Sequence, residues 1–374
     1  MDLVRKLLIL FIVIITIIIL YFLYVSRRNI LFNINAELDT NIKEGLFTAS
    51  AESEYTSMKT ALGSDGPGVS NVDSSKYGKL PLREFCIKAS YDSALSGTFV
   101  SIDALNFVLS RGCRFIDLEV FFINNAPHVA FTTDSTLTTI SAQSPILLSD
   151  ALKAIVQNAF TGTAPNQRDP LFLQLRIRTN NTELYNMVGV NIHNSLSNHL
   201  YAGAVDGSTT YNDVAGKVVL ITNKLINQNY LDLANYKGCK GVSTDNTNNN
   251  CFILSKFANL ESGGSTLDTT TNQILSGQTN KPPIIRDDGS NKTSIVKWSL
   301  VEPDTTTENN IQYNQLMMNY GAQIIGFNFN SIAIKNQTPA NNLMSYEKFF
   351  SDNNAAMVPL SVAIPYLKKQ SASG

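Results

Sequence analysis

The sequence predicts an α/β protein built on a parallel sheet, preceded by a single N-terminal transmembrane helix. Two patterns indicate this fold class. Apolar runs of strand length alternate with longer helical patterns, and a long apolar run stands near the N-terminus. The chain has 374 residues, which would suit two medium domains or one α/β barrel of about 250 residues, so length does not choose between them.

The apolar run covers residues 7–25, LLILFIVIITIIILYFLYV, with Thr16 as its only clearly polar side chain. At about 1.5 Å per residue it reaches roughly 28 Å, close to the hydrocarbon thickness of a bilayer. A cleaved signal peptide is the alternative, but such peptides have a shorter run and a small-residue cleavage site. We therefore expect residues 1–28 to be a single-pass anchor that contacts the membrane through Leu7–Val25. Basic residues flank it equally, so charge predicts no orientation.

Residues 29–79 include the polar stretch SDGPGVSNVDSSKYGK, which is typical of a tether. The folded part is expected to begin near Leu80, with β and α patterns alternating after it. Strands are expected within 85–89, 113–122, 127–132, 170–179, 216–225 and 294–303, and helices within 101–112 and 147–160. Residues 259–291 are rich in small polar side chains and predict a long exposed excursion. The apolar segment 355–369, broken by two prolines, predicts an edge strand or a strap.

Composition excludes several classes of function. The 29 basic and 30 acidic residues leave a formal charge of -1, so no positive field is available and a nucleic-acid partner is not expected. Four cysteines are too few for a disulfide framework in a chain of this length, and their spacing is not that of a zinc site. No metal or other cofactor is predicted.

Local sequences in these units resemble phosphoinositide-specific phospholipase C. In the first half, IKASYDSALSG, RGCRFIDLEVFF and PHVAFTTDSTLTT resemble the strands and loops that bear that family's site. In the second half, SLVEP and YNQLMMNYGAQIIGFNFNS are similar to its substrate-reading strand and its last helix and strand. The resemblance implies one TIM-type (β/α) barrel over 80–367, with an X-like half at 80–228 and a Y-like half at 229–367.

The family's chemistry needs two histidines, and this chain has neither. The family's Ser-His-Asn-Thr-Tyr matches residues 90–94, where Tyr91 replaces the histidine, and its Tyr-His-Gly matches residues 131–133, where Thr132 does. A phenol titrates near 10, so it is a poor general base at neutral pH, and a threonine hydroxyl cannot exchange a proton there. The chain's three histidines, His128, His193 and His199, align with neither position.

The family's calcium ligands, an Asn, two acidic residues and a later Glu, match Asp92, Asp117, Glu119 and Arg176. Because Asp117 and Glu119 are two apart on one strand, they point to the same side. Arg176 brings a guanidinium where a fourth carboxylate is expected. We therefore predict an ion-pair cluster at the mouth of the barrel in place of a metal site.

The family's substrate-binding positions also differ. Its two lysines match Ile221 and Asn223, and its Ser-Arg-Ile-Tyr-Pro segment matches residues 299–303, where Leu300 and Glu302 remove a cation and an aromatic ring. Glu302 would repel a phosphorylated head group, so lipid head-group binding is not expected.

Together these features predict a membrane-anchored barrel without catalytic activity that packs against other proteins as a structural scaffold. A membrane-associated assembly such as a viral capsid, and hence the virion, is one setting. Two alternatives stay open: a divergent phosphodiesterase that uses Asp92, Asp117 and Glu119 with another base, and a phosphoinositide head-group binder without turnover.

Overall fold

The computed structural model describes residues 15–16, 18–19, 21, 50–63, 66, 68–134, 139–224, 233–235, 252–271, 298–303, 313–330 and 343–373. Most of the predicted anchor, 7–25, lies outside these ranges. Its described residues are helical and exposed, and they include Ile15, Ile18 and Ile19. Within the described part of the chain, no helix is both long and apolar enough to cross a membrane.

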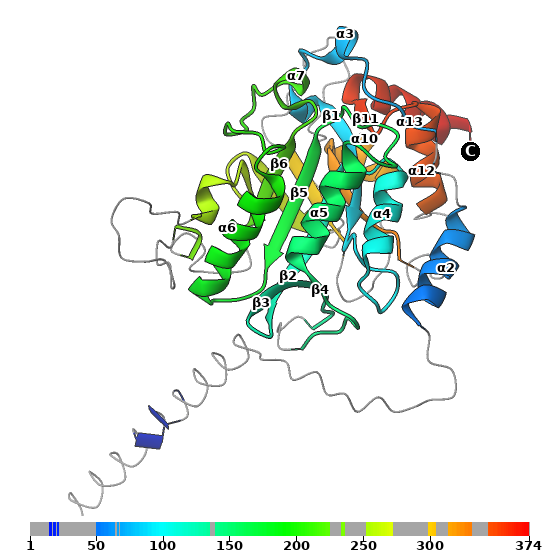
Figure 1. Ribbon diagram of the computed structural model, residues 1–374. Helices are drawn as coiled ribbons and strands as arrows, with labels where there is room; N and C mark the ends of the chain where they lie inside the picture. The colour runs from blue at the N-terminus through cyan, green and yellow to red at the C-terminus, as the bar shows by residue number, and fades with distance from the viewer. Residues whose placement is uncertain are drawn as a thin grey trace, which may run out of the picture.

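A parallel barrel forms the centre of the protein (Figure 1). Its strands pair in parallel around the ring, and β10 and β2 both pair with β1, which closes it. In ring order the strands are β1 (Phe85–Tyr91), β2 (Phe115–Ile123), β5 (Leu171–Ile177), β6 (Val218–Asn223), β7 (Leu260–Ser262), β8 (Leu267–Thr271), β9 (Trp298–Glu302) and β10 (Ile324–Asn328). The prediction of a single parallel α/β barrel is confirmed.

The helices cover the outside of the ring. Ser101 begins α4 by accepting a hydrogen bond from the Ala104 N–H, and Asn181 begins α6 in the same way from Glu183. No helix lies between β7 and β8, which residues 263–266 connect. The helices are α2 (Ala51–Leu62), α3 (Ser74–Tyr77), α4 (Ile102–Ser110), α5 (Leu148–Ala159), α6 (Thr182–Leu196), α7 (Tyr211–Val214), α10 (Tyr313–Tyr320), α12 (Leu343–Asp352) and α13 (Leu360–Ser373), with short 3₁₀ turns η1 (Leu82–Glu84) and η2 (Leu254–Lys256).

The pairing between β1 and β2 is short. Only Ala89 with Phe115 and Ser90 with Ile116 pair there, whereas β2 and β5 pair over the six positions 115–120. Antiparallel strand β11 (Met357–Pro359) pairs with the first half of β1, and a hairpin of β3 (Ala126–Ala130) and β4 (Ile146–Leu147) extends β2 beyond the ring. At this seam the first half of β1 pairs with β11 and the second half of β2 pairs with β3, so these two halves do not pair with each other.

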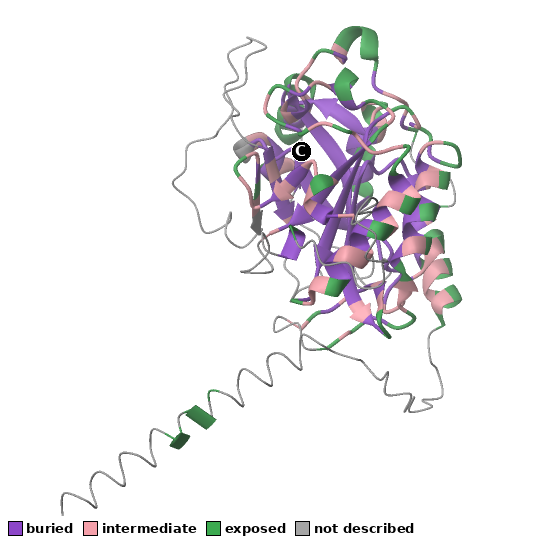
Figure 2. Cartoon of the chain, turned by 60° about the vertical axis from the view of Figure 1, so that its left-hand side comes forward, coloured by how far each residue is buried: buried purple, intermediate pink, exposed green. Residues whose placement is uncertain are grey.

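Two separate apolar cores hold the barrel together. One fills the barrel interior and includes Phe115, Phe172, Trp298 and Leu300, and the other lies between the strands and the outer helices and includes Leu118 and Leu173. Figure 2 shows the strands buried along their length while the helices expose their outer faces. Strands buried on both sides explain why the apolar runs in the sequence are continuous and do not alternate.

Two sequence expectations need correction, and a third, the edge strand expected in 355–369, is confirmed in part. The predicted tether contains α2, which packs on the barrel with Met58 and Leu62 buried, so folded structure begins about thirty residues earlier than Leu80. The predicted excursion 259–291 contains barrel strands β7 and β8, whose short polar sequences do not have a strand's apolar pattern; the rest of it lies outside the described residues. The C-terminal segment supplies edge strand β11 and then helix α13, which contains Pro365.

Candidate functional site

The carboxyl ends of the barrel strands carry a polar layer above the apolar interior. On β2, Asp117 and Glu119 share the inward face with Phe115, because side chains alternate along a strand. On β5, Arg176 is directly paired with Glu119 in the ladder. Asp92 follows the end of β1 with a φ of 46°, a left-handed conformation that Asp tolerates better than most residues. Four sequence-predicted residues therefore meet at the mouth of the barrel, where α/β barrels carry their active sites.

Arg176 lies at the centre of this layer and contacts all three acidic residues. Its Nε donates to both carboxylate oxygens of Asp117 at 2.9 and 3.1 Å, and its Nη2 donates to Asp117 at 2.7 Å. The same Nη2 pairs with the Asp92 carboxylate, and Nη1 reaches Glu119 at 3.4 Å. The Arg176 side chain is 2% exposed. The planar guanidinium thus donates hydrogen bonds to all three carboxylates of this acidic cluster, Asp92, Asp117 and Glu119.

Tyr91 lies beneath this guanidinium. The Arg176 guanidinium carbon is 4.3 Å from the centre of the Tyr91 ring, which is a cation–π contact. Burial raises the pKa of the Tyr91 phenol well above its usual value of 10, although the nearby Arg176 charge acts in the opposite direction. The phenol therefore stays protonated at neutral pH, and it cannot act as a general base.

Thr132 lies on the other side of the cluster and supports Glu119. Its backbone N–H donates to the Glu119 carboxylate at 3.1 Å, while its hydroxyl donates to the Thr139 carbonyl at 2.6 Å and accepts from the Asp134 N–H at 3.0 Å. The hydroxyl therefore acts both as a donor and as an acceptor in fixing the loop after β3. Thr132 serves as a positioning residue for Glu119.

Two residues that sequence reasoning missed complete the layer. Arg178 Nε pairs with Glu119, and Gln174 Nε2 donates to the Glu302 carboxylate at 3.1 Å. Gln174, Arg176 and Arg178 alternate along β5 and its end, so the same two-residue period that linked Asp117 to Glu119 would have found them.

The cluster holds more acidic than basic groups. Four carboxyls, those of Asp92, Asp117, Glu119 and Glu302, face the two guanidiniums. Burial, together with the neighbouring carboxylates, raises the pKa of Asp92 to about 8 against the opposing Arg176 charge. Burial also raises the pKa of Glu302. A proton on Asp92 relieves part of the excess negative charge.

The residues do not fit a calcium ion. Calcium requires six to eight oxygen ligands, but each of the three candidate carboxylates already accepts a hydrogen bond from Arg176. The fixed guanidinium stands among those ligands, where it would repel a divalent cation. Among the residues that the structure describes, no group of three or more His, Cys, Asp or Glu side chains is arranged to hold a metal ion.

The former substrate positions divide into two pairs. Ile221 and Leu300 are fully buried in the apolar interior of the barrel and do not join the cluster. Asn223, at the end of β6, is buried in the mouth layer, and Glu302 joins the cluster through Gln174.

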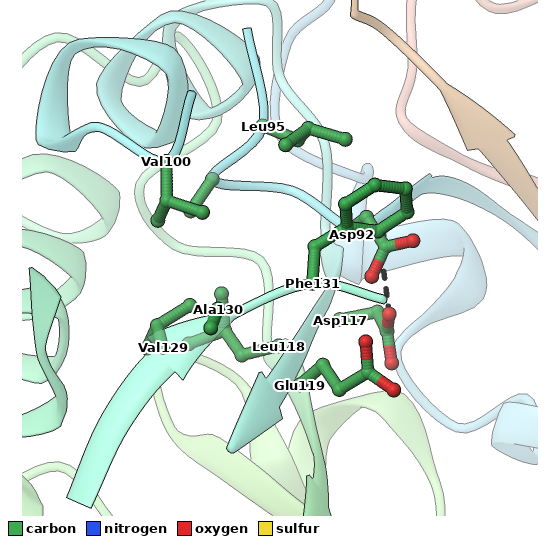
Figure 3. A pocket seen from close by; sticks show the side chains of 10 residues that line it. Asp92, Leu95, Val100, Asp117, Leu118, Glu119, Val129, Ala130 and Phe131 are labelled. Carbon is green, nitrogen blue, oxygen red and sulfur yellow. Dashed lines mark hydrogen bonds between the residues drawn. The ribbon is translucent and has the colours of Figure 1, made fainter. Parts of the chain in front are cut away.

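Little space is left beside the cluster. The cavity lined by Asp92, Asp117 and Glu119 has a volume of about 10 Å³, roughly what one water molecule needs. In Figure 3 the carboxylates of Asp117 and Glu119 turn away from Leu95 and Val129, which form the apolar side of that cavity. An inositol ring does not fit there.

Residues 79–224 match the family model described as phosphatidylinositol-specific phospholipase C, X domain. No curated protein matches the sequence.

Solved structures with a similar arrangement share little sequence. PLC21 of L. pealei is 16% identical with a TM-score of 0.49, and the similarity covers 69% of this chain and 35% of that one. The phosphatidylinositol-specific phospholipase C of Listeria monocytogenes is 16% identical with a TM-score of 0.41, covering 70% and 95%. A calcium-dependent phosphoinositol-specific phospholipase C of Pseudomonas sp is 12% identical with a TM-score of 0.40, covering 70% and 94%. The chain thus spans about a third of the length of the L. pealei protein.

The matched range contains strands β1 to β6, and with them every residue of the cluster except Glu302. Over residues 79–224 the chain is therefore similar to the phosphatidylinositol-specific phospholipase C X domain.

Proposed function

We propose that this protein is a catalytically inactive phospholipase C-like barrel that serves as a scaffold at a membrane. The observation that carries the proposal is the position of Arg176, whose guanidinium occupies the centre of the acidic cluster. A site filled in this way has no place for a metal ion or a head group. The buried ion pairs stabilise the mouth of the barrel only while they stay together.

The absence of a proton-transfer pair supports the same proposal. Tyr91 and Thr132 stand at the matched histidine positions, and both are engaged in other contacts. The chain's own histidines contact other parts of the fold: His193 stacks on Phe252, and His199 stacks on Phe160 of the segment that ends α5. His128 contacts its own hairpin, through the Ala126 carbonyl. A histidine is therefore not available at the mouth.

Membrane anchoring through Leu7–Val25 is part of the proposal. Its support is the apolar run itself, together with the exposed isoleucines among its described residues. The test is extraction of the expressed full chain from membranes at alkaline pH. We expect it to stay in the membrane fraction and to be released when residues 1–28 are deleted. Release of the full chain by alkali would contradict the anchor.

One observation favours a second candidate, a divergent phosphodiesterase. Burial raises the pKa of Asp92 to about 8, and a carboxyl that titrates near neutral pH is suited to general acid–base catalysis. We rank it second because Asp92 is paired with Arg176 and faces a cavity with room for only about one water.

Head-group binding can be tested with the chain's single tryptophan. Trp298 is fully buried in the barrel interior, on the strand that ends at Glu302, so its fluorescence reports on the space below the mouth. Titration with inositol 1-phosphate should leave its emission unchanged. A saturable change that disappears in Arg178→Gln would support a head-group binder and count against the scaffold.

A further inference from the structure

Helix α2 is fixed to the barrel at both of its ends. Near its start, the Glu54 carboxylate accepts hydrogen bonds from the Thr98 backbone N–H at 2.6 Å and from the Thr98 hydroxyl at 3.3 Å. At its end, the Gly63 carbonyl accepts a hydrogen bond from Arg111 Nη1 at 3.0 Å. The helix therefore runs from the loop after β1, at the mouth of the barrel, to the opposite end of α4.

The apolar contacts of α2 are few. Met58 and Leu62 are its buried residues, and Tyr55 meets Phe107 of α4 edge to face with ring centres 6.1 Å apart. The helix has 12 residues, and isolated helices of that length are marginal in water. Its order consequently depends on docking, and it can separate from the barrel at a smaller cost than any barrel strand.

The loop that Glu54 holds is the one that carries Asp92. Residues 92–100 connect β1 to α4, and Leu95 and Val100 of this loop line the cavity beside the cluster. In addition to the contacts with Glu54, the Thr98 carbonyl accepts a hydrogen bond from the Gln143 N–H at 2.7 Å. The Val100 N–H donates a hydrogen bond to the Gln143 carbonyl at 3.0 Å. The loop is thus held between Gln143 on one side and α2 on the other.

We propose that α2 is a latch, and that its docking on the barrel controls the loop that carries Asp92 of the acidic cluster. When α2 is docked, Glu54 holds Thr98 and keeps the loop in the position that presents Asp92 to Arg176. When α2 undocks, Thr98 loses its anionic partner and the loop loosens around Asp92. The coupling goes beyond the scaffold function and does not depend on whether the barrel hydrolyses lipid.

Hydrogen exchange of the full chain in detergent, followed by mass spectrometry, tests the latch. Glu54→Gln removes the charge that Thr98 binds, and Glu52→Gln, an exposed position on the same helix, is the matched control. We expect Glu54→Gln to speed exchange in residues 92–101 roughly tenfold or more, since a charge-assisted hydrogen bond is lost, and Glu52→Gln to leave it as in the parent. Unchanged exchange in residues 92–101 of Glu54→Gln would overturn the proposal.

A second variant tests whether undocking of the whole helix α2, and not only loss of the Glu54–Thr98 hydrogen bonds, loosens the loop that carries Asp92. Met58→Asp places a charge in the buried face of α2 and undocks the helix without touching Glu54. If α2 is a latch, peptides from residues 50–62 and from residues 92–101 become unprotected together, and the Asp92 N–H, which donates to Asp117 at 3.1 Å, exchanges faster. Loss of protection in residues 50–62 alone would show that α2 and the cluster are independent.

Discussion

The guanidinium of Arg176 lies on the ring of Tyr91, 4.3 Å from its centre, so two residues of the mouth layer contact each other. The ring covers one face of the guanidinium, and the edge of the guanidinium donates to Asp117 and Asp92. A histidine at position 91 would be less suited to this contact, because a protonated imidazole would repel the guanidinium. The side chains of Tyr91 and Arg176 therefore stabilise one another.

Arg176→Ala should destabilise the folded domain by about 3–5 kcal/mol, because it leaves buried carboxylates without their cation. Lys153→Ala is the matched control: Lys153 pairs with Asp150 on the surface, where such a pair contributes about 0–1 kcal/mol. Urea unfolding followed by Trp298 fluorescence measures both. A loss below about 1 kcal/mol in Arg176→Ala would mean that the pairs contribute little.

Arg176→Glu should create a calcium site. The substitution removes the fixed cation and adds two oxygens to a cluster that already holds three carboxylates. We expect the melting temperature to rise with Ca²⁺ in this variant and to stay constant in Arg176→Gln, since ligand binding to the folded state stabilises it. Equal responses of the two variants would indicate that the geometry cannot hold the ion.

Asp92→Asn should change how stability depends on pH. In the unfolded chain Asp92 ionises near pH 4, whereas in the folded chain burial raises its pKa to about 8. The folded state therefore holds a proton that the unfolded state lacks between about pH 4 and about pH 8, and the contribution of Asp92 to stability falls as pH rises.

Relative to Asp92→Asn, the parent should lose up to about 1.4 kcal/mol per pH unit across that window. Urea unfolding of both proteins at about pH 5 and about pH 8 measures the difference, and titrating groups that do not interact with Asp92 cancel in the comparison. A parent that gains stability relative to the variant as pH rises would show that the Arg176 charge outweighs burial.

Glu347→Ala should cost about 3–5 kcal/mol, because Glu347 is the common partner of two buried cations. Lys88 Nζ donates to it at 3.1 Å and is fully buried, and Arg111 Nε donates to it at 2.6 Å. Asp352→Ala on the same helix is the control, since the Asp352 partner Lys348 is exposed, and it should cost far less. Similar losses of stability in the two variants would show that the buried ion pairs of Glu347 with Lys88 and Arg111 contribute no more than an exposed pair.

Strand periodicity explains how much of the site could be predicted. Asp117 and Glu119 share a face because they are two apart on β2, and Arg176 lies on the neighbouring strand of the same barrel, so their meeting follows from the fold. The same rule applied to Arg176 would have identified Arg178. It was missed because the family resemblance assigned no role to that position.

Other parts of the structure left no clear signal in the sequence. Only Met58 and Leu62 of α2 are buried, so its sequence resembles a tether. Strand β7 has three residues, and its pairing with β6 makes it a strand although its own composition does not predict one. Ile221 and Leu300 matched substrate-binding positions by alignment alone, and their apolar side chains belong to the barrel interior, as burial of apolar surface favours.

Hydrolysis of labelled phosphatidylinositol by the purified full chain with millimolar Ca²⁺ tests the central claim most directly. The claim is that Arg176 and Tyr91 leave the mouth of the barrel without a metal site or a general base. We predict no release of inositol phosphate above the level given by Asp117→Asn, across the pH range in which Asp92 titrates. Release by the parent that depends on Ca²⁺ and is abolished by Asp117→Asn would contradict it.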